Sequence, residues 1–239
     1  MRGAASAAVA APSRDFLLER LHSLAGVVPL GAFLVEHILG NAFAVRSWGG
    51  PEAYDRYVLF LLGTPFLKGF LELFLVYLPL AFHGWYGLAI TRRATANVGR
   101  YGFERNWAYL VQRVTGVVLI AYIVTHVISE RFASEIGVWA SHAAFMSPAQ
   151  LADWHRAPSA PYQHMVAVLS IPAYYAFSYL GLLAATLHFA QGLWSFCVRW
   201  GIVVGARAQT GLKYACGALF VALSLAGVAA LNSFTPIGR

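Results

Sequence analysis

The segment VAVLSIPAYYAFSYLGLLAATLHFAQGLWSFCV, residues 166–198, contains no Asp, Glu, Lys or Arg. It is long enough to cross a bilayer as a helix, because about 20 apolar residues span the hydrocarbon core. Four further apolar runs carry their charges mainly near the ends, and they cover residues 24–45, 66–90, 107–128 and 212–231. Runs of this length satisfy their backbone hydrogen bonds in lipid only as helices. The sequence therefore predicts an all-α integral membrane protein with five transmembrane helices.

The composition excludes several other classes of protein. The 239 residues are 59% hydrophobic and only 11% charged, whereas about a quarter of the residues of a soluble domain are charged. The net charge of +7 reflects few acids rather than a dense basic patch, which argues against nucleic acid as a partner. Cys197 and Cys216 form no CxxC motif, so the sequence offers no site for covalent haem or a Cys-bound metal.

The distribution of cations predicts the orientation of the chain. With the N-terminus inside, residues such as Arg92, Arg93, Arg199 and Arg207 fall on the cytoplasmic side, where Lys and Arg are favoured. We therefore expect an N-in, C-out topology. Residues 1–23 would form a cytoplasmic tail, residues 24–231 the membrane domain and residues 232–239 a short outer tail. The fourth run contains Pro172, which predicts a kink or an interfacial first turn.

Four histidines lie one each in the first four predicted helices. A single intramembrane His is usually a packing residue or part of a proton relay. At about 1.5 Å per residue, His37 and His126 lie in the outer half of the membrane, whereas His83 and His188 lie in the inner half. A four-helix bundle can place each pair across its core. Neutral imidazoles that face each other across an iron macrocycle would explain these polar groups, so we expect the first four helices to form a haem-binding bundle.

Helical phase provides a second test of this arrangement. A step of 11 residues returns to nearly the same face of a helix. It leads from His37 to Gly26, and from His126 to Thr115, so the first and third helices carry small residues beside the inner pair. Close packing of membrane helices explains such small residues equally well.

Short motifs in the same helices resemble a known family. They are Arg20-Leu21-His22-Ser23, Glu36-His37, Gln112-Arg113-Val114-Thr115-Gly116, and His188-Phe189-Ala190-Gln191-Gly192-Leu193-Trp194. In this order they resemble the single-chain, five-helix, di-haem cytochrome b subunit of succinate dehydrogenase and fumarate reductase. The resemblance covers residues 14–198, and the fifth helix matches in place rather than in motif.

The resemblance implies the ligands of two b haems, each held by two histidines. His83 and His188 would bind the haem nearer the cytoplasm, and His37 and His126 the outer haem. It also implies contacts to the inner haem's propionates at His22, Ser23, Trp107 and Arg199. Arg113 lies at comparable depth, where anchoring by the positive-inside rule is an adequate alternative.

The resemblance also implies partners and a cellular location. The family anchors a flavoprotein subunit with FAD and an iron-sulfur subunit, which convert succinate and fumarate in the cytoplasm. This chain would bind no dicarboxylate and would sit in the bacterial cytoplasmic membrane with its lipids. Electrons would pass through the haems to a membrane quinone, and the di-haem form favours menaquinone. A higher oligomer of the whole complex is left open.

Glu72 is the candidate for quinone chemistry. A step of 11 residues places it on the His83 face, at the depth of the outer haem, where a reduced quinone must take up protons. A salt bridge with Lys68 explains this acid equally well. Some fumarate-reducing relatives carry an acid two residues before the fourth haem His for transmembrane proton transfer, and Thr186 stands there in this chain.

Two other functions are compatible with the histidines. One is the cytochrome b anchor of a formate dehydrogenase or hydrogenase, which would co-purify with different soluble subunits. The other is a small transporter in which histidines relay protons. The transporter would be colourless, and it leaves the two layers of histidines unexplained.

Overall fold

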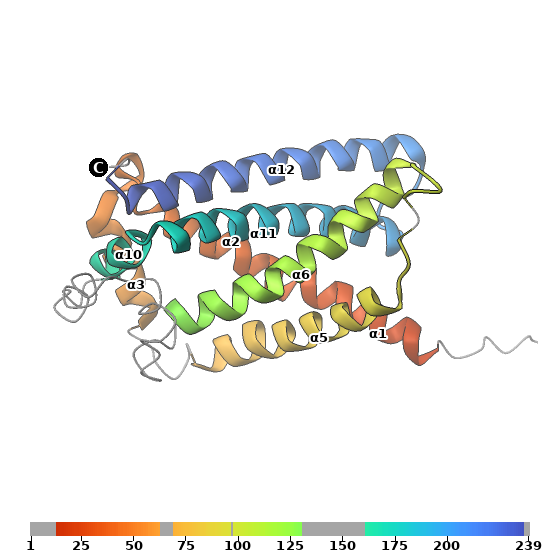
Figure 1. Ribbon diagram of the computed structural model, residues 1–239, viewed down its shortest axis with the longest axis horizontal. Coiled ribbons are helices and arrows are strands. Elements are labelled where there is room, and N and C mark those ends of the chain that lie inside the picture. Colours follow the sequence, from red (N-terminus) through yellow and green to blue (C-terminus); the bar gives the residue numbers. More distant parts are fainter. Residues whose placement is uncertain (1–12, 63–68, 97, 131–160, 237–239) are drawn as a thin grey trace, which may run out of the picture.

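The computed structural model describes residues 13–62, 69–96, 98–130 and 161–236 (Figure 1). Within these residues every regular element is a helix, and none is a strand. Five helical segments are long and apolar enough to cross a membrane: Arg14–Ala42, Gly69–Arg93, Glu104–Glu130, Pro172–Arg199 and Ala206–Ser233. Each of them overlaps one of the five predicted runs, so the prediction of five helical spans is confirmed for the described residues. Lys68, most of the link before Pro161 and both chain ends lie outside the described residues.

The first span consists of two helices, α1 (Arg14–Val27) and α2 (Pro29–Ala42). Ser13 caps α1, because its hydroxyl accepts a hydrogen bond from the Phe16 amide at 3.3 Å. Pro29 has no amide hydrogen and opens α2, which explains the interruption at Val28. The helix begins well before the apolar run at residue 24, so His22 lies within the first span rather than in a tail.

The second span contains an irregular turn three residues after its first described residue, Gly69. The segment η2 (Glu72–Tyr77) is a π-helix, and α5 (Leu78–Arg93) continues it. Pro79 near the start of α5 lacks the amide that would bond back into the preceding turn, which accounts for the wider winding there. Glu72 is the first residue of this turn.

The remaining spans are α6 (Glu104–Glu130), α11 (Pro172–Arg199) and α12 (Ala206–Ser233). The short helix α10 (Pro161–Leu169) precedes α11 and is separated from it at Ser170 and Ile171. Pro172 opens α11, so the predicted disturbance at this proline is confirmed as a break between two helices.

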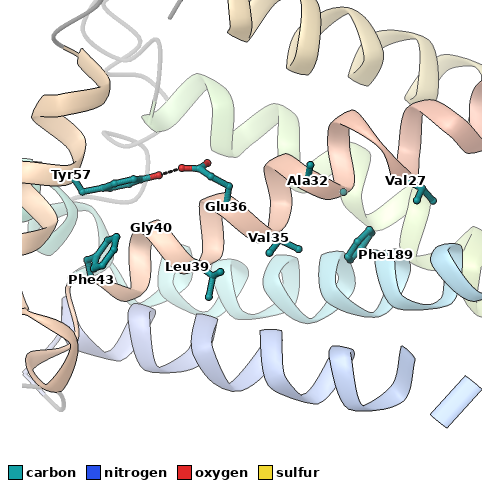
Figure 2. A pocket seen from close by; sticks show the side chains of 10 residues that line it. Val27, Ala32, Val35, Glu36, Leu39, Gly40, Phe43, Tyr57 and Phe189 are labelled. Carbon is teal, nitrogen blue, oxygen red and sulfur yellow. Dashed lines mark hydrogen bonds between the residues drawn. The ribbon is translucent and has the colours of Figure 1, made fainter. Parts of the chain in front are cut away.

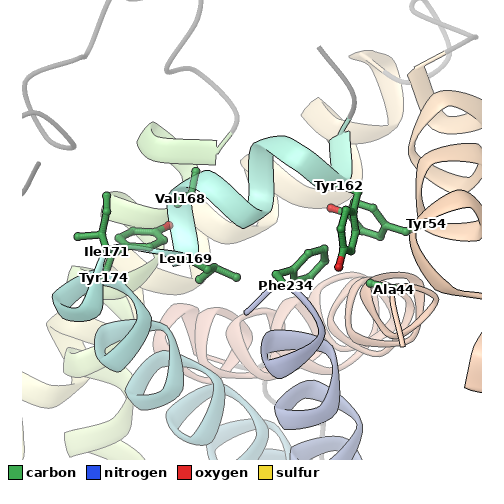
Figure 3. Packing of buried hydrophobic residues seen from close by; sticks show 8 residues of the cluster. All are labelled: Ala44, Tyr54, Tyr162, Val168, Leu169, Ile171, Tyr174 and Phe234. Carbon is green, nitrogen blue, oxygen red and sulfur yellow. The ribbon is translucent and has the colours of Figure 1, made fainter. Parts of the chain in front are cut away.

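Three short elements gather at the end of the bundle opposite the start of α1. They are η1 (Arg46–Trp48), α3 (Gly50–Leu62) and α10, near the end of α12 (Figure 1). A cluster of buried hydrophobic residues holds the elements at this end of the molecule together. Its members are Ala44, Tyr54, Tyr162, Val168, Leu169, Ile171, Tyr174 and Phe234 (Figure 3). The Tyr162 hydroxyl donates to the Ser233 carbonyl at 2.7 Å, which ties α10 to the end of α12.

The first four spans pack in a closed ring. α1 contacts α5 and α11, and α6 contacts the same two helices, whereas α12 packs outside against α11 and α2. Large apolar side chains on the outside of the spans are exposed, for example Trp85 at 76% and Leu225 at 65%. Such side chains face lipid in a membrane protein. In the ring of four spans, the four histidines lie on neighbouring helices.

Candidate functional site

The inner pair of histidines joins α5 to α11. The ring centroids of His83 and His188 are 6.1 Å apart, and the ring planes are 86° to each other. Two imidazoles that bind one metal ion from opposite sides, each with a nitrogen about 2 Å from it, have centroids about 6 Å apart. The observed separation therefore fits a pair of axial ligands.

Each ring of the inner pair is oriented through its Nδ1 atom. His83 Nδ1 lies 3.0 Å from the His22 carbonyl oxygen, and His188 Nδ1 lies 3.0 Å from the Thr115 hydroxyl oxygen. The Thr115 hydroxyl hydrogen is directed at the Val111 carbonyl, 2.8 Å away, so its oxygen can accept from His188. When both Nδ1 atoms donate, both Nε2 atoms keep a lone pair. This is the tautomer that a metal-binding imidazole requires.

Two glycines provide the space beside these rings. A Cβ atom added at Gly26 would collide with the His83 imidazole, and one at Gly116 would lie 3.2 Å from His188 Cε1. Both glycines come from the first and third spans, where helical phase predicts small residues beside the inner pair. That part of the prediction is confirmed.

The outer pair joins α2 to α6. The centroids of His37 and His126 are 5.9 Å apart with an interplanar angle of 81°, close to the geometry of the inner pair. Phe33 stacks on His37 and Tyr122 stacks on His126, each at 5.3 Å between centroids. Asn41 Nδ2 lies 3.5 Å from His37 Nε2 and donates to the His37 carbonyl at 2.8 Å. The predicted pairing into two layers is thus present in the positions of the side chains.

The histidines do not build a metal centre from side chains alone. Across the described ranges, no three His, Cys, Asp or Glu side chains come together around a point where a metal ion could bind. Two ligands per layer instead fit a metal whose other four positions are filled by a planar macrocycle, as in haem.

His22 belongs to the inner site, although the sequence placed it outside the spans. Its ring stacks on His83 with 4.1 Å between centroids and an interplanar angle of 4°. A Cβ atom added at Gly87 would lie 3.0 Å from His22 Nε2. His22 therefore supports His83 twice, through its ring and through its carbonyl oxygen.

The other predicted propionate contacts are only partly brought together. Ser23 accepts a hydrogen bond from the Trp200 indole at 3.1 Å, and the neighbouring Arg20 donates to the Arg199 carbonyl at 2.7 Å. The Arg199 guanidinium lies 3.9 Å from a Glu19 carboxylate oxygen. Ser23 and Arg199 therefore share one polar cluster at the end of the bundle where α1 begins.

Trp107 and Arg113 lie on α6 and do not join this cluster through any contact seen among the described residues. The Trp107 side chain is 51% exposed. The Arg113 guanidinium lies over the Tyr109 ring, 4.4 Å from its centroid, and Arg113 Nε donates to the Tyr109 carbonyl at 3.4 Å. The contacts of Arg113 are with its own helix, which agrees with the anchoring alternative.

A groove lies along α2 on the face that carries Glu36 (Figure 2). Its volume is about 700 Å³, and apolar side chains line most of it. The Tyr57 hydroxyl of α3 donates to the Glu36 carboxylate. Burial, followed by this hydrogen bond, raises the pKa of Tyr57. None of the four paired histidines lines the groove.

The sequence resembles a curated protein over nearly all its length. It is 37% identical to the succinate dehydrogenase cytochrome b558 subunit of Bacillus subtilis (strain 168), over 222 residues that cover 93% of this chain and 98% of that protein. This chain belongs to the family of succinate dehydrogenase cytochrome b subunits. No family model matches the sequence, and no solved structure matches it.

As a succinate dehydrogenase cytochrome b subunit, the chain is a multi-pass membrane component of an electron-transport enzyme and associates with the other subunits of that enzyme. The family assignment favours succinate dehydrogenase over formate dehydrogenase or hydrogenase. It also disfavours a colourless transporter, because a cytochrome b carries haem.

The structure gives a physical reason for a motif of this cytochrome b subunit that the sequence showed only as a resemblance. Gln112 Nε2 donates to the His188 carbonyl at 3.2 Å, and the neighbouring Thr115 and Gly116 contact the His188 ring. Gln112, Thr115 and Gly116 of this motif therefore hold His188 from the facing helix, whereas Arg113 contacts its own helix. Trp200 was not singled out from the sequence, and its position directly after Arg199 was the available signal.

Proposed function

We propose that this chain holds two b haems, one between His83 and His188 and the other between His37 and His126. The observation that carries the proposal is the pair of imidazole separations, 6.1 and 5.9 Å, with nearly perpendicular rings in both pairs. When bound, haem b supplies one-electron transfer at its iron. The four side chains would bind the iron atoms and keep the two groups in separate layers of the bundle.

The chain would connect a soluble electron donor to the membrane. We place the N-terminus in the cytoplasm, because α5 ends in Arg92 and Arg93 and α11 ends in Arg199, whose guanidinium lies 3.9 Å from a Glu19 carboxylate oxygen of α1. The flavoprotein and iron-sulfur subunits, with FAD and iron-sulfur clusters, would dock at this end and handle the dicarboxylate. The inner pair lies nearer to this end, and the outer pair nearer to the opposite one. Electrons would therefore cross the bacterial cytoplasmic membrane from the donor to the quinone side.

Residues at the inner end would bind the haem propionates. Arg199, Ser23 and His22 are the stronger candidates, because Ser23 and Arg199 share one polar cluster and His22 stacks on His83. Charged and hydroxyl donors of this kind form strong hydrogen bonds to carboxylates. Trp107 and Arg113 are the weaker candidates, given the exposure of the first and the local contacts of the second.

Glu72 remains the candidate for proton transfer to a quinone, for which menaquinone is the favoured chemistry. It opens the π-helical turn of the second span, and such turns often mark functional sites. The variant Glu72→Gln should retain both haems and lose quinone reduction. If Glu72→Gln reduced quinone at the full parental rate, Glu72 would not belong to the quinone site.

The proposal is tested on the complex as it purifies from the membrane. We expect the chain to co-purify with a flavoprotein and an iron-sulfur protein, and succinate to reduce its b haem within the assay. Menaquinone and ubiquinone analogues, compared as acceptors, then identify the preferred quinone. A haem-free preparation, or haem that succinate cannot reduce, would contradict the proposal.

A further inference from the structure

One carboxylate is buried at the outer end of α6, outside the two histidine pairs. The Glu130 side chain is only 13% exposed. It lies four residues after His126, about 6 Å farther along the helix and on the same face. Burying a carboxyl group at a membrane boundary is costly unless the group is paired or functional. Its position one turn beyond an expected haem ligand therefore calls for an explanation.

Neighbouring elements supply the polar partners of Glu130. The Tyr174 hydroxyl of α11 donates to Glu130 Oε1 at 2.8 Å, and His164 Nε2 of α10 lies 3.8 Å from Glu130 Oε2. Among the described residues, Oε2 has no hydrogen-bond partner. Glu130 thus has one oxygen fixed by a tyrosine and the other turned toward a histidine.

This cluster spans the distance between the outer pair and the surface. On the inner side, Glu130 lies four residues beyond His126, on whose ring Tyr122 stacks. On the outer side, the His164 side chain is 38% exposed. Burial lowers the pKa of His164, so the imidazole is neutral near pH 7 and able to pass a proton on.

The titratable groups around Glu130 come from four elements. They are Tyr122 on α6, Tyr174 on α11, His164 on α10, and Tyr54 with its neighbour Asp55 on α3. Asp55 accepts a hydrogen bond from the Tyr162 amide at 2.7 Å and so has a structural role of its own. Within this set, the partly exposed His164 lies beside the buried carboxylate of Glu130, so these two groups follow one another from the surface inward.

We propose that His164 and Glu130 form a proton relay between the outer aqueous phase and a quinone that reacts beside the outer histidine pair. The inference rests on the proposed function. Reduction of a quinone to the quinol takes two electrons, which come from succinate through the partner subunits, and two protons, which come from water. His164 would collect each proton at the surface, and the Glu130 carboxylate would accept it and release it inward. Oxidation of the quinol would use the same groups in reverse.

The test uses the purified succinate dehydrogenase complex with Glu130→Gln in this chain. The amide keeps an oxygen for the Tyr174 hydroxyl but holds no transferable proton. We expect unchanged haem content and unchanged haem reduction by succinate, with quinone reduction slowed about tenfold or more. Glu130→Asp should restore much of the rate. The control is Glu52→Gln, at an acid of α3 whose side chain is 90% exposed, and it should behave as the parent complex.

His164→Gln provides an independent arm, because it leaves the Tyr174–Glu130 hydrogen bond in place. We expect slower quinone reduction and an altered pH profile, again with both haems present. If the Glu130→Gln complex loses haem, the quinone-reduction rate and pH profile of His164→Gln decide whether the relay exists. A parental rate and pH profile in the haem-replete Glu130→Gln complex, or in His164→Gln, would overturn the relay. Failure of the proposed function would differ, since the parent complex itself would then lack succinate-reducible haem.

Discussion

At the scale of single residues, the two inner histidines have second partners that orient their rings. The carbonyl of His22 and the hydroxyl of Thr115 accept from the Nδ1 atoms of His83 and His188. Acceptors of this kind raise the basicity of a metal-bound imidazole and orient it. The proposed inner haem site therefore depends on at least two residues that are not themselves proposed ligands.

Thr115→Val tests this second layer of contacts. Valine has nearly the shape of threonine but cannot accept a hydrogen bond from His188. We expect haem binding at the inner site to weaken about tenfold or more. We also expect the midpoint potential of the inner haem to rise, because a less basic imidazole stabilises ferric iron less. The haem content of the purified complex measures the first effect, and a redox titration of the b haems measures the second. Thr115→Ser serves as the control that keeps the acceptor.

An unchanged inner haem in Thr115→Val would show that the contact orients nothing. A change confined to the outer haem would reverse the assignment of the two layers.

At the scale of helices, the prolines and glycines of the spans decide how the site fits together. Pro29 separates α1 from α2, and Pro79 follows the π-helical turn that begins at Glu72. Gly26 and Gly116 let the first and third spans approach the inner histidines.

Gly26→Val should eliminate the inner haem. Its side chain would occupy the space of the His83 imidazole, and this ring cannot move away without breaking its stacking on His22 and its contact with the His22 carbonyl. We expect one haem per chain instead of two, measured from the reduced-minus-oxidised spectrum and the protein content.

The matched control is Gly217→Ala on α12, where an added Cβ atom meets no other atom. It should retain both haems and gain up to about 1 kcal/mol of helix stability. Two haems in Gly26→Val would contradict the close approach of these helices.

A polar contact also joins α11 to α12. The hydroxyls of Tyr175 and Tyr179 both donate to Asn232 Oδ1, at 2.6 and 2.5 Å. Asn232→Leu leaves both hydroxyls without this acceptor, so we expect a loss of about 1–3 kcal/mol in stability. Thermal unfolding of the complex in detergent measures it, with the exposed Tyr214→Phe as control. An unchanged Tm would show that this contact contributes nothing.

At the scale of the whole molecule, the sequence predicts the architecture well and the details less so. Long apolar runs identify all five spans, and the spacing of histidines along antiparallel helices predicts their two layers. The π-helical turn at Glu72 and the stacking of His22 on His83 could not be predicted, because both depend on how neighbouring segments pack. The helix α3 was missed for a different reason: its sequence is too short and too polar to stand out as a span.

The orientation of the whole chain can be tested with a reporter fused after Arg239. The cations of the cytoplasmic loops predict that the C-terminus lies outside. An alkaline phosphatase fusion, which is active only outside the cytoplasm, should therefore be active. If the alkaline phosphatase fusion were inactive and a reporter that works only in the cytoplasm were active at the same position, the topology would be the reverse. The assignment of inner and outer haems would then be reversed as well.

If four histidines hold two b haems in this one chain, the haem content per polypeptide must change when either pair is broken. We would measure it in the purified parent complex and in the variants His83→Ala and His37→Ala. We expect two haems in the parent and one in each variant, with different haems lost, while His164→Gln keeps both. A parent with one haem or none, or two variants that lose the same haem, would contradict this prediction.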